Sequence, residues 1–123
     1  MKHDLKKYFS KLTFRNTSFE KGTGLMFKKS FIDECYIFPF AYEKKIPITM
    51  LFVFFPIDVV WTNLEGEVVD LRRNAKPFVF NIYHKGKASN LIEMPVGSID
   101  KFKIKLMDKV TFQNEQEWIV FYN

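Results

Sequence analysis

The residue with the clearest chemical implication is Asp58, because it is the only charged residue in the run 48–63, ITMLFVFFPIDVVWTN. A carboxylate in an apolar run is costly to bury unless a partner neutralises it or donates hydrogen bonds to it. The run therefore predicts the core of the protein and one polar group that this core must accommodate. Such a carboxylate could close an ion pair, orient a ligand at the mouth of a pocket, or act as a general base.

The sequence that follows this run offers Asp58 two arginine partners. Residues 63–66, Asn-Leu-Glu-Gly, predict a four-residue hairpin loop with a glycine for positive φ. Counting inward from that loop places Asp58 opposite Leu71, with Arg73 as its diagonal neighbour on the same face. A slip of one residue places Arg72 opposite Asp58 instead. We predict a buried or half-buried ion pair of Asp58 with Arg73 or Arg72, in preference to a ligand-orienting role.

Other chemistry finds little support in the sequence. One cysteine, Cys35, and two distant histidines, His3 and His84, do not give the ligand spacing of a zinc site, and we predict no metal and no cofactor. Neither a nucleophile elbow nor a phosphate-binding loop motif is present. We interpret Cys35 as an apolar filler and His84, within His-Lys-Gly-Lys, as a solvated loop residue. These observations favour a binding module over an enzyme.

Charge and composition restrict the partners and the location. The net charge is +5, but sixteen of the nineteen cations are lysines scattered along the chain, and arginine is the residue that base or phosphate recognition favours. A nucleic-acid-binding module is therefore an alternative that we do not favour. A single cysteine suits a reducing compartment, the basic N-terminus lacks a following apolar region, and the run 48–63 is too short to span a membrane. We expect a cytoplasmic protein without a membrane span.

Short apolar runs separated by turn residues indicate a β-rich chain. We expect one domain over residues 1–123, folded as a mostly-β, compact antiparallel β-barrel or sandwich with one or two short helices. The helical segments are expected near 16–21 and from Ser98, an N-cap, to residue 106. The predicted strands are residues 9–15, 36–38, 48–54, 57–62, 67–72, 78–83, 91–94, 110–112 and 118–121.

Three motifs, in a fixed order, point to a known family. They are GLMFKKS at 24–30, MLFVFFPIDVVWTNLEGEVV at 50–69 and IEMPVGSIDKFKIKLMDKV at 92–110. Over about residues 16–112 the chain resembles the family called domain of unknown function 192, also known as uncharacterised protein family 0127. The resemblance implies a compact, mostly-β domain of bacterial and archaeal proteins, here similar to a cytoplasmic archaeal form. It implies no activity.

Matches and departures within these motifs both concern the site. The matching residues are Gly24, Leu25, Met26, Phe27, Pro56, Asp58, Gly66, Glu93, Pro95, Gly97 and Asp108. The family commonly has Trp-Met-Lys-Asn-Thr at the positions that are Thr-Met-Leu-Phe-Val here, residues 49–53. Met107 stands where the family has a glycine before the aspartate. A ligand site built on the Lys-Asn-Thr side chains is therefore not expected in this chain.

The leading hypothesis is a non-enzymatic module that binds a small molecule or a protein surface. Asp58 and Glu93 are its polar candidates. Met26 and Phe27 are its apolar candidates, although simple core packing is the favoured interpretation of both. An enzyme that uses Asp58 or Glu93 as a general base is the first alternative, and it requires a pocket holding one of them with a raised pKa. The nucleic-acid alternative requires lysines and exposed aromatic residues to converge on one face.

Overall fold

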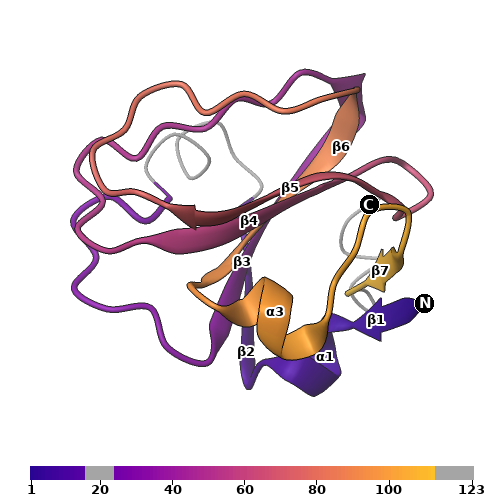
Figure 1. The fold of residues 1–123 in the computed structure, drawn as a ribbon, viewed down its shortest axis with the longest axis horizontal. Helices are drawn as coiled ribbons and strands as arrows, with labels where there is room; N and C mark the ends of the chain where they lie inside the picture. Colours follow the sequence, from indigo (N-terminus) through magenta and orange to yellow (C-terminus); the bar gives the residue numbers. More distant parts are fainter. Residues whose placement is uncertain (16–23, 113–123) are drawn as a thin grey trace.

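The computed structural model describes residues 1–15 and 24–112, and within these it contains seven strands and two short helices (Figure 1). The predicted helix near 16–21 and the predicted strand 118–121 lie outside the described residues. The elements in chain order are β1 (Lys2–Asp4), α1 (Leu5–Tyr8), β2 (Lys11–Phe14), β3 (Glu34–Lys44), β4 (Ile57–Thr62), β5 (Val68–Ala75), β6 (Ala88–Pro95), α3 (Ser98–Phe102) and β7 (Lys109–Thr111). The prediction of a mostly-β fold with one or two short helices is confirmed.

The main sheet has the strand order β2-β3-β6-β4-β5, and β1 and β7 form a second, two-stranded sheet. The three pairings among β3, β6, β4 and β5 are antiparallel, whereas β2 pairs with β3, and β1 with β7, in parallel. The five-stranded sheet ends at β2 and β5, so in the described part of the chain it stays open and does not close into a barrel. Of the two expected architectures, the sandwich is therefore the one that fits.

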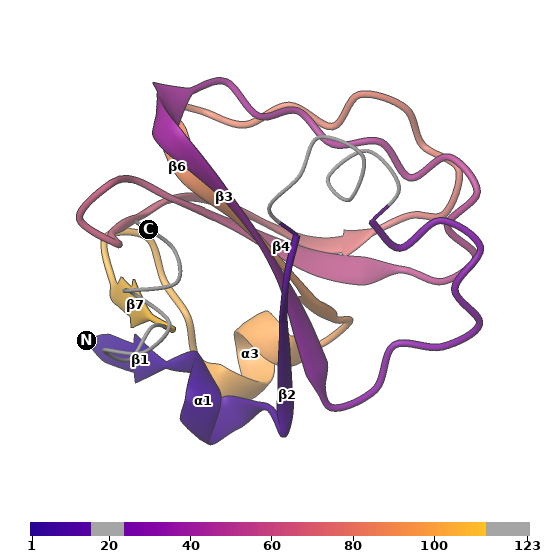
Figure 2. The ribbon, with the colours of Figure 1, turned by 180° about the vertical axis from the view of Figure 1, so that it is seen from behind.

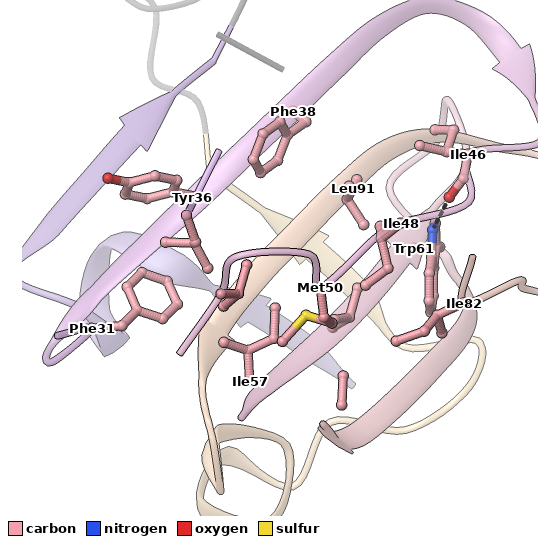
Figure 3. Close-up of a cluster of buried hydrophobic side chains, with 14 of the residues drawn as sticks. Phe31, Tyr36, Phe38, Ile46, Ile48, Met50, Ile57, Trp61, Ile82 and Leu91 are labelled. Atoms are coloured by element: carbon pink, nitrogen blue, oxygen red, sulfur yellow. Dashed lines mark hydrogen bonds between the residues drawn. The ribbon is translucent and has the colours of Figure 1, made fainter. Parts of the chain in front are cut away.

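One face of the main sheet is covered by connections that have no helix. In β4, Ile57, Val59 and Trp61 point to this face, because successive residues of a strand alternate between faces. Residues from the connections 45–56 and 76–87 pack onto them, and Figure 3 shows Ile46, Ile48, Met50 and Ile82 gathered around Trp61 and Ile57. The Trp61 indole N–H donates to the Ile46 carbonyl at 2.9 Å, which fixes one connection to the sheet.

The opposite face is covered by α1, α3 and the small sheet, which lie together in both views (Figures 1 and 2). Val60, Ile92 and Met94 point to this side and contact a cluster that includes Leu5 and Ile99 from the two helices. The main sheet is therefore the middle layer of the molecule and is buried on both faces. All six residues of β4 are buried, as expected of a strand that is covered on both faces.

Residues 48–54 do not form the predicted strand. An isolated bridge joins Ile48 to Ile82, and the chain then turns, with the Val53 amide donating to the Met50 carbonyl at 3.0 Å. Phe52 has a φ of 57°, which interrupts an extended conformation. Residues 78–83 likewise contribute only that bridge, through Ile82. The prediction that β3 ends before Pro39 is also wrong, since the strand continues through an irregularity to Lys44.

The hairpin between β4 and β5 has the predicted loop but not the predicted register. The Gly66 amide donates to the Asn63 carbonyl at 3.0 Å, and Gly66 has a φ of 83°, as expected. A Cβ at Gly66 would also lie 2.8 Å from the Val110 carbonyl oxygen, so β7 needs a glycine there. An irregularity between Trp61 and Thr62 shifts the pairing, and Leu71 lies opposite Val60 instead of Asp58.

Candidate functional site

Glu93 lies in the middle of the main sheet and faces an apolar cavity. It belongs to β6, where its register partners are Tyr36 in β3 and Val59 in β4. The cavity has a volume of about 230 Å³ and lies between this sheet face and segments 24–26 and 46–53. Its lining comprises Gly24, Leu25, Met26, Phe38, Phe40, Ile46, Pro47, Ile48, Thr49, Met50, Val53, Ile57, Leu91 and Glu93. Glu93 is the only ionisable residue among them.

The surroundings of Glu93 favour its protonated form. Burial raises the pKa of its carboxyl group from 4.5 to about 8, although the positive charge of Arg15 acts in the opposite direction. The Arg15 guanidinium lies 5.5 Å from the centre of the ring of Tyr36, which is the register partner of Glu93 in β3. At neutral pH the cavity therefore contains a largely neutral carboxyl group that can both donate and accept a hydrogen bond.

The two apolar candidates separate in the structure. Met26 lines the cavity, as a ligand-contacting residue would. Phe27 is 66% exposed and points away from the cavity lining, where its ring stacks on Phe52 at a centroid distance of 4.9 Å. The first motif therefore contributes Gly24, Leu25 and Met26 to the cavity lining and Phe27 to the surface.

Asp58 does not share a site with Glu93. Asp58 pairs with Met94, and Glu93 pairs with Val59, so the two carboxyl groups point to opposite faces of the sheet. The Asp58 oxygens accept hydrogen bonds from two backbone amides, that of Asn74 at 3.0 Å and that of Ile99 at 2.9 Å. Asp58 thus joins the irregular edge of β5 to the first turn of α3 and acts as a structural anchor.

The predicted ion pair of Asp58 with Arg73 or Arg72 is wrong. The register shift between Trp61 and Thr62 places Arg72 opposite Val59. The second shift, between Ile57 and Val59, places Ala75 opposite Ile57, and the Asn74 amide donates to Asp58. The Arg73 side chain points to the surface, where its Nε donates to the Asp100 carboxylate at 2.8 Å. The backbone therefore supplies the partners that we had assigned to a guanidinium. The prediction of Ser98 as the N-cap is also wrong, because Gly97 occupies that position and the Ser98 hydroxyl donates to the Pro95 carbonyl at 2.6 Å.

A second polar cluster, which sequence reasoning missed, joins the N-terminal strand to the residue that precedes β7. His3 is 1% exposed, its Nε2 lies 2.7 Å from the Asp108 carboxylate, and its Nδ1 lies 2.6 Å from the Tyr8 hydroxyl. Because a carboxylate only accepts, Nε2 carries the proton, and in the neutral ring Nδ1 accepts from Tyr8. The partners are separated by up to 105 positions in the sequence, and only the family's aspartate at Asp108 hinted at this cluster.

His84 is buried, which corrects its interpretation as a solvated loop histidine. Its Nε2 accepts from the Ile46 amide at 2.8 Å, its Nδ1 lies 3.0 Å from the Lys85 carbonyl, and its ring stacks on Trp61 at 4.9 Å. An amide can only donate, so His84 holds the neutral tautomer with its proton on Nδ1. His84 and Trp61 together fix Ile46, which lines the cavity.

Metal and thiol chemistry gain no support from the described residues. No three histidine, cysteine, aspartate or glutamate side chains among them are grouped as metal ligands. Cys35 is fully buried on the helix-covered face, and burial raises the pKa of its thiol well above the ordinary value. Cys35 is therefore a packing residue. No helix in residues 1–15 or 24–112 is long and apolar enough to cross a bilayer.

The fold and the site define a small mostly-β domain with an open, sandwich-like sheet and one buried acid in an apolar cavity. The chain belongs to the domain of unknown function 192 family, described as "Uncharacterized ACR", whose profile matches residues 2–112. The resemblance found in the motifs is thereby confirmed, and the match begins earlier than residue 16, so that it includes β1 and His3.

Two kinds of relatives support this assignment. A UPF0127 protein of Thermococcus sibiricus (strain DSM 12597 / MM 739) is 32% identical over 114 residues, which are 91% of this chain and 72% of that protein. A crystal structure of a protein of unknown function from Novosphingobium aromaticivorans DSM 12444 has a TM-score of 0.75 at 25% identity, covering 80% and 71% of the two chains. A structure from Sinorhizobium meliloti 1021 has the same TM-score at 17% identity, covering 80% and 78%, and shows the fold alone.

Proposed function

We propose that this domain binds a small, mainly apolar molecule in the cavity beside Glu93, without a catalytic step of its own. The observation that carries the proposal is a buried carboxyl group that faces an apolar cavity and whose pKa burial raises to about 8. Burial of a carboxyl group in apolar surroundings costs free energy, and a ligand that forms hydrogen bonds with it offsets part of this cost.

The cavity and its acid restrict the class of ligand. An apolar cavity of about 150 Å³ is enough for benzene in another protein, and the present one is larger, at about 230 Å³. A neutral carboxyl group offers one donor beside one acceptor, which an amide or a carboxylic acid matches with two hydrogen bonds. We therefore propose a ligand with a small apolar body and one amide or carboxyl group.

A thermal-shift titration with benzamide and hexanamide tests this proposal, with toluene as the matched apolar control. We expect both amides to raise the melting temperature, and Glu93→Leu to remove the advantage of the amides over toluene. Glu93→Gln keeps a donor and an acceptor and is expected to retain amide binding. No shift with either amide, or equal shifts in the wild type and Glu93→Leu, would contradict the proposal.

One observation favours a second candidate, an enzyme with Glu93 as a general acid or base. A concave site that holds an acid with a raised pKa is the condition that such an enzyme must meet. Among the lining residues, however, the only other polar side chain is that of Thr49, and its hydroxyl already accepts from the Leu51 amide at 3.2 Å. Binding is therefore the better supported of the two functions.

The cytoplasmic location is part of the same proposal. The single cysteine is buried and free, which suits a protein that does not depend on disulfide formation.

A further inference from the structure

Four phenylalanine side chains form an exposed aromatic patch on the surface. Phe27, Phe52, Phe54 and Phe78 are 66%, 41%, 55% and 46% exposed. Their rings contact one another, with centroid distances of 4.9 Å between Phe27 and Phe52 and 5.3 Å between Phe54 and Phe78. Exposed apolar residues are ordinary when they are scattered, whereas a contiguous group of large ones marks an interaction site.

The aromatic patch is held in place by the backbone. It is built on segments 24–30, 49–56 and 76–83, and the Phe27 amide donates to the Phe52 carbonyl at 2.9 Å. The Phe78 amide donates to the Met50 carbonyl at 2.8 Å, and the Met50 amide donates to the Val79 carbonyl at 2.8 Å. These bonds join three segments that are distant in the sequence into one surface.

Three of the four phenylalanines have a strained backbone. The φ angles of Phe27, Phe52 and Phe78 are 61°, 57° and 64°, in the left-handed region that bulky residues rarely adopt. All three side chains stay 41–66% exposed, so their burial offsets this strain only in part. Strained conformations persist at sites of function, so the patch is better explained by what it contacts than by folding.

The charged residues of the three patch segments are all basic. The three segments contain Lys28, Lys29 and Lys76 and no aspartate or glutamate. Lys28 is paired with Glu34 at 3.4 Å, whereas Lys29 and Lys76 are exposed. A partner that buries the phenylalanines therefore gains most if it is anionic.

Two possible occupants fit these observations less well. In a two-fold dimer through the patch, Lys29 and Lys76 of both copies would meet at one interface and repel. Single-stranded nucleic acid needs free ring faces for base stacking, but here the rings of Phe27 and Phe52 stack on each other, 18° from parallel.

We propose that the aromatic patch docks this protein on the surface of an anionic lipid bilayer, with the phenylalanines among the acyl chains and the lysines at the headgroups. Exposed phenylalanine flanked by lysine is the combination that anchors peripheral proteins at such a surface. The chain lies on the bilayer and does not span it. This docking does not depend on a ligand in the cavity, and Glu93→Leu is expected to leave it unchanged.

Co-sedimentation with vesicles tests the proposal. We expect the wild type to bind mixed phosphatidylcholine and phosphatidylglycerol vesicles, to bind pure phosphatidylcholine vesicles weakly, and to dissociate as salt is added. Phe54→Ser is expected to weaken binding about tenfold, because one large apolar side chain is lost from the bilayer. Leu64→Ser is the matched control, because Leu64 is 60% exposed in the 63–66 turn and lies outside the patch.

Two variants with the same change in net charge test whether the lysines at the patch attract the lipid headgroups locally. Lys76→Glu is expected to weaken binding more than Lys7→Glu, which changes the net charge equally on α1. Absence of vesicle binding by the wild type, or equal losses in Phe54→Ser and Leu64→Ser, would overturn the proposal. Two other results would also overturn it. In both, Phe54→Ser leaves vesicle binding intact, and it abolishes either dimer formation or binding to an oligothymidylate.

Discussion

At the scale of single residues, chemical role follows the direction of the side chain more than the residue type. Asp58 and Glu93 are both buried acids on neighbouring strands, but they point to opposite faces of the sheet. Asp58 meets two amides that require an acceptor, and Glu93 meets an apolar cavity that favours its neutral form. The first is therefore an anchor and the second a candidate ligand partner.

Met107 shows how a family position can be filled by an unfavourable residue. The Asp108 amide donates to the Lys105 carbonyl at 3.1 Å, and Met107, third in this turn, has a φ of 71°. A type II turn calls for glycine at that place, which is the residue that the family resemblance led us to expect. Because Met107 is 68% exposed, its side chain contributes little packing in return.

We expect Met107→Gly to stabilise the protein by about 0.5–1 kcal/mol, since relief of left-handed strain exceeds the added entropy of the unfolded chain. Urea denaturation at constant pH measures this change. Leu106→Gly is the matched control, because Leu106 is 57% exposed in the same turn and has a negative φ. Leu106→Gly should lower the stability, and equal losses in both variants would show that Met107 is not strained.

At the scale of elements, the second half of the chain is assembled around Asp58. Its carboxylate ties together β4, the irregular end of β5 and the first turn of α3. The helix has five residues and Gly97 as its N-cap, without a capping side chain of its own. A carboxylate from a neighbouring strand replaces the missing cap.

Asp58→Ala is expected to lower the free energy of unfolding by about 2–4 kcal/mol, because the buried Ile99 amide and the part-buried Asn74 amide lose their acceptor. Arg73→Ala should change it by less than about 0.5 kcal/mol, since the Arg73–Asp100 pair is solvent-exposed. The two effects should add in a double-mutant cycle followed by chemical denaturation. A coupling energy well above about 0.5 kcal/mol would instead indicate an ion pair between Asp58 and Arg73.

Local signals in the sequence predicted the elements that local chemistry determines. The loop 63–66, the strand 57–62 and a helix from Ser98 were found because turn residues, β-branched residues and a following amphipathic turn mark them. Segment 48–54 was misassigned because Phe52 adopts a left-handed conformation that its residue type does not announce. The partners of Asp58 were misassigned because a one-residue irregularity redirects a whole strand face.

The site was predictable only in part, for the same physical reason. Glu93 and Met26 were selected as candidates from the family motifs, and the cavity that they share is formed by connections with no regular structure. The positions of those connections depend on Trp61, His84 and Ile46, which meet only in the folded chain. The aromatic patch likewise depends on three distant segments, of which only the apolar character was visible in the sequence.

At the scale of the whole molecule, two acids make stability depend on pH in opposite directions. The pKa of Glu93 is raised to about 8, so its contribution is complete below pH 4.5 and is lost as the pH rises to about 8. The pKa of Asp108 is lowered, first by the hydrogen bond from His3, so its contribution is present above pH 3.8 and is lost as the pH falls through the folded-state pKa. Ionisation of Glu93 therefore lowers the stability at alkaline pH, and protonation of Asp108 lowers it at acidic pH.

Denaturation of the wild type, Glu93→Gln and Asp108→Asn across pH separates the two contributions. Relative to Glu93→Gln, the wild type should lose stability between about pH 4.5 and 8, with a slope approaching the 1.4 kcal/mol per pH unit of a single proton. Relative to Asp108→Asn, the wild type should lose stability only below about pH 3.8, where the hydrogen bond between His3 of β1 and the Asp108 carboxylate is lost. If the Glu93 difference stayed flat across its window, the carboxyl group would be ionised in the folded protein, and the cavity would then call for a cationic ligand instead of an amide.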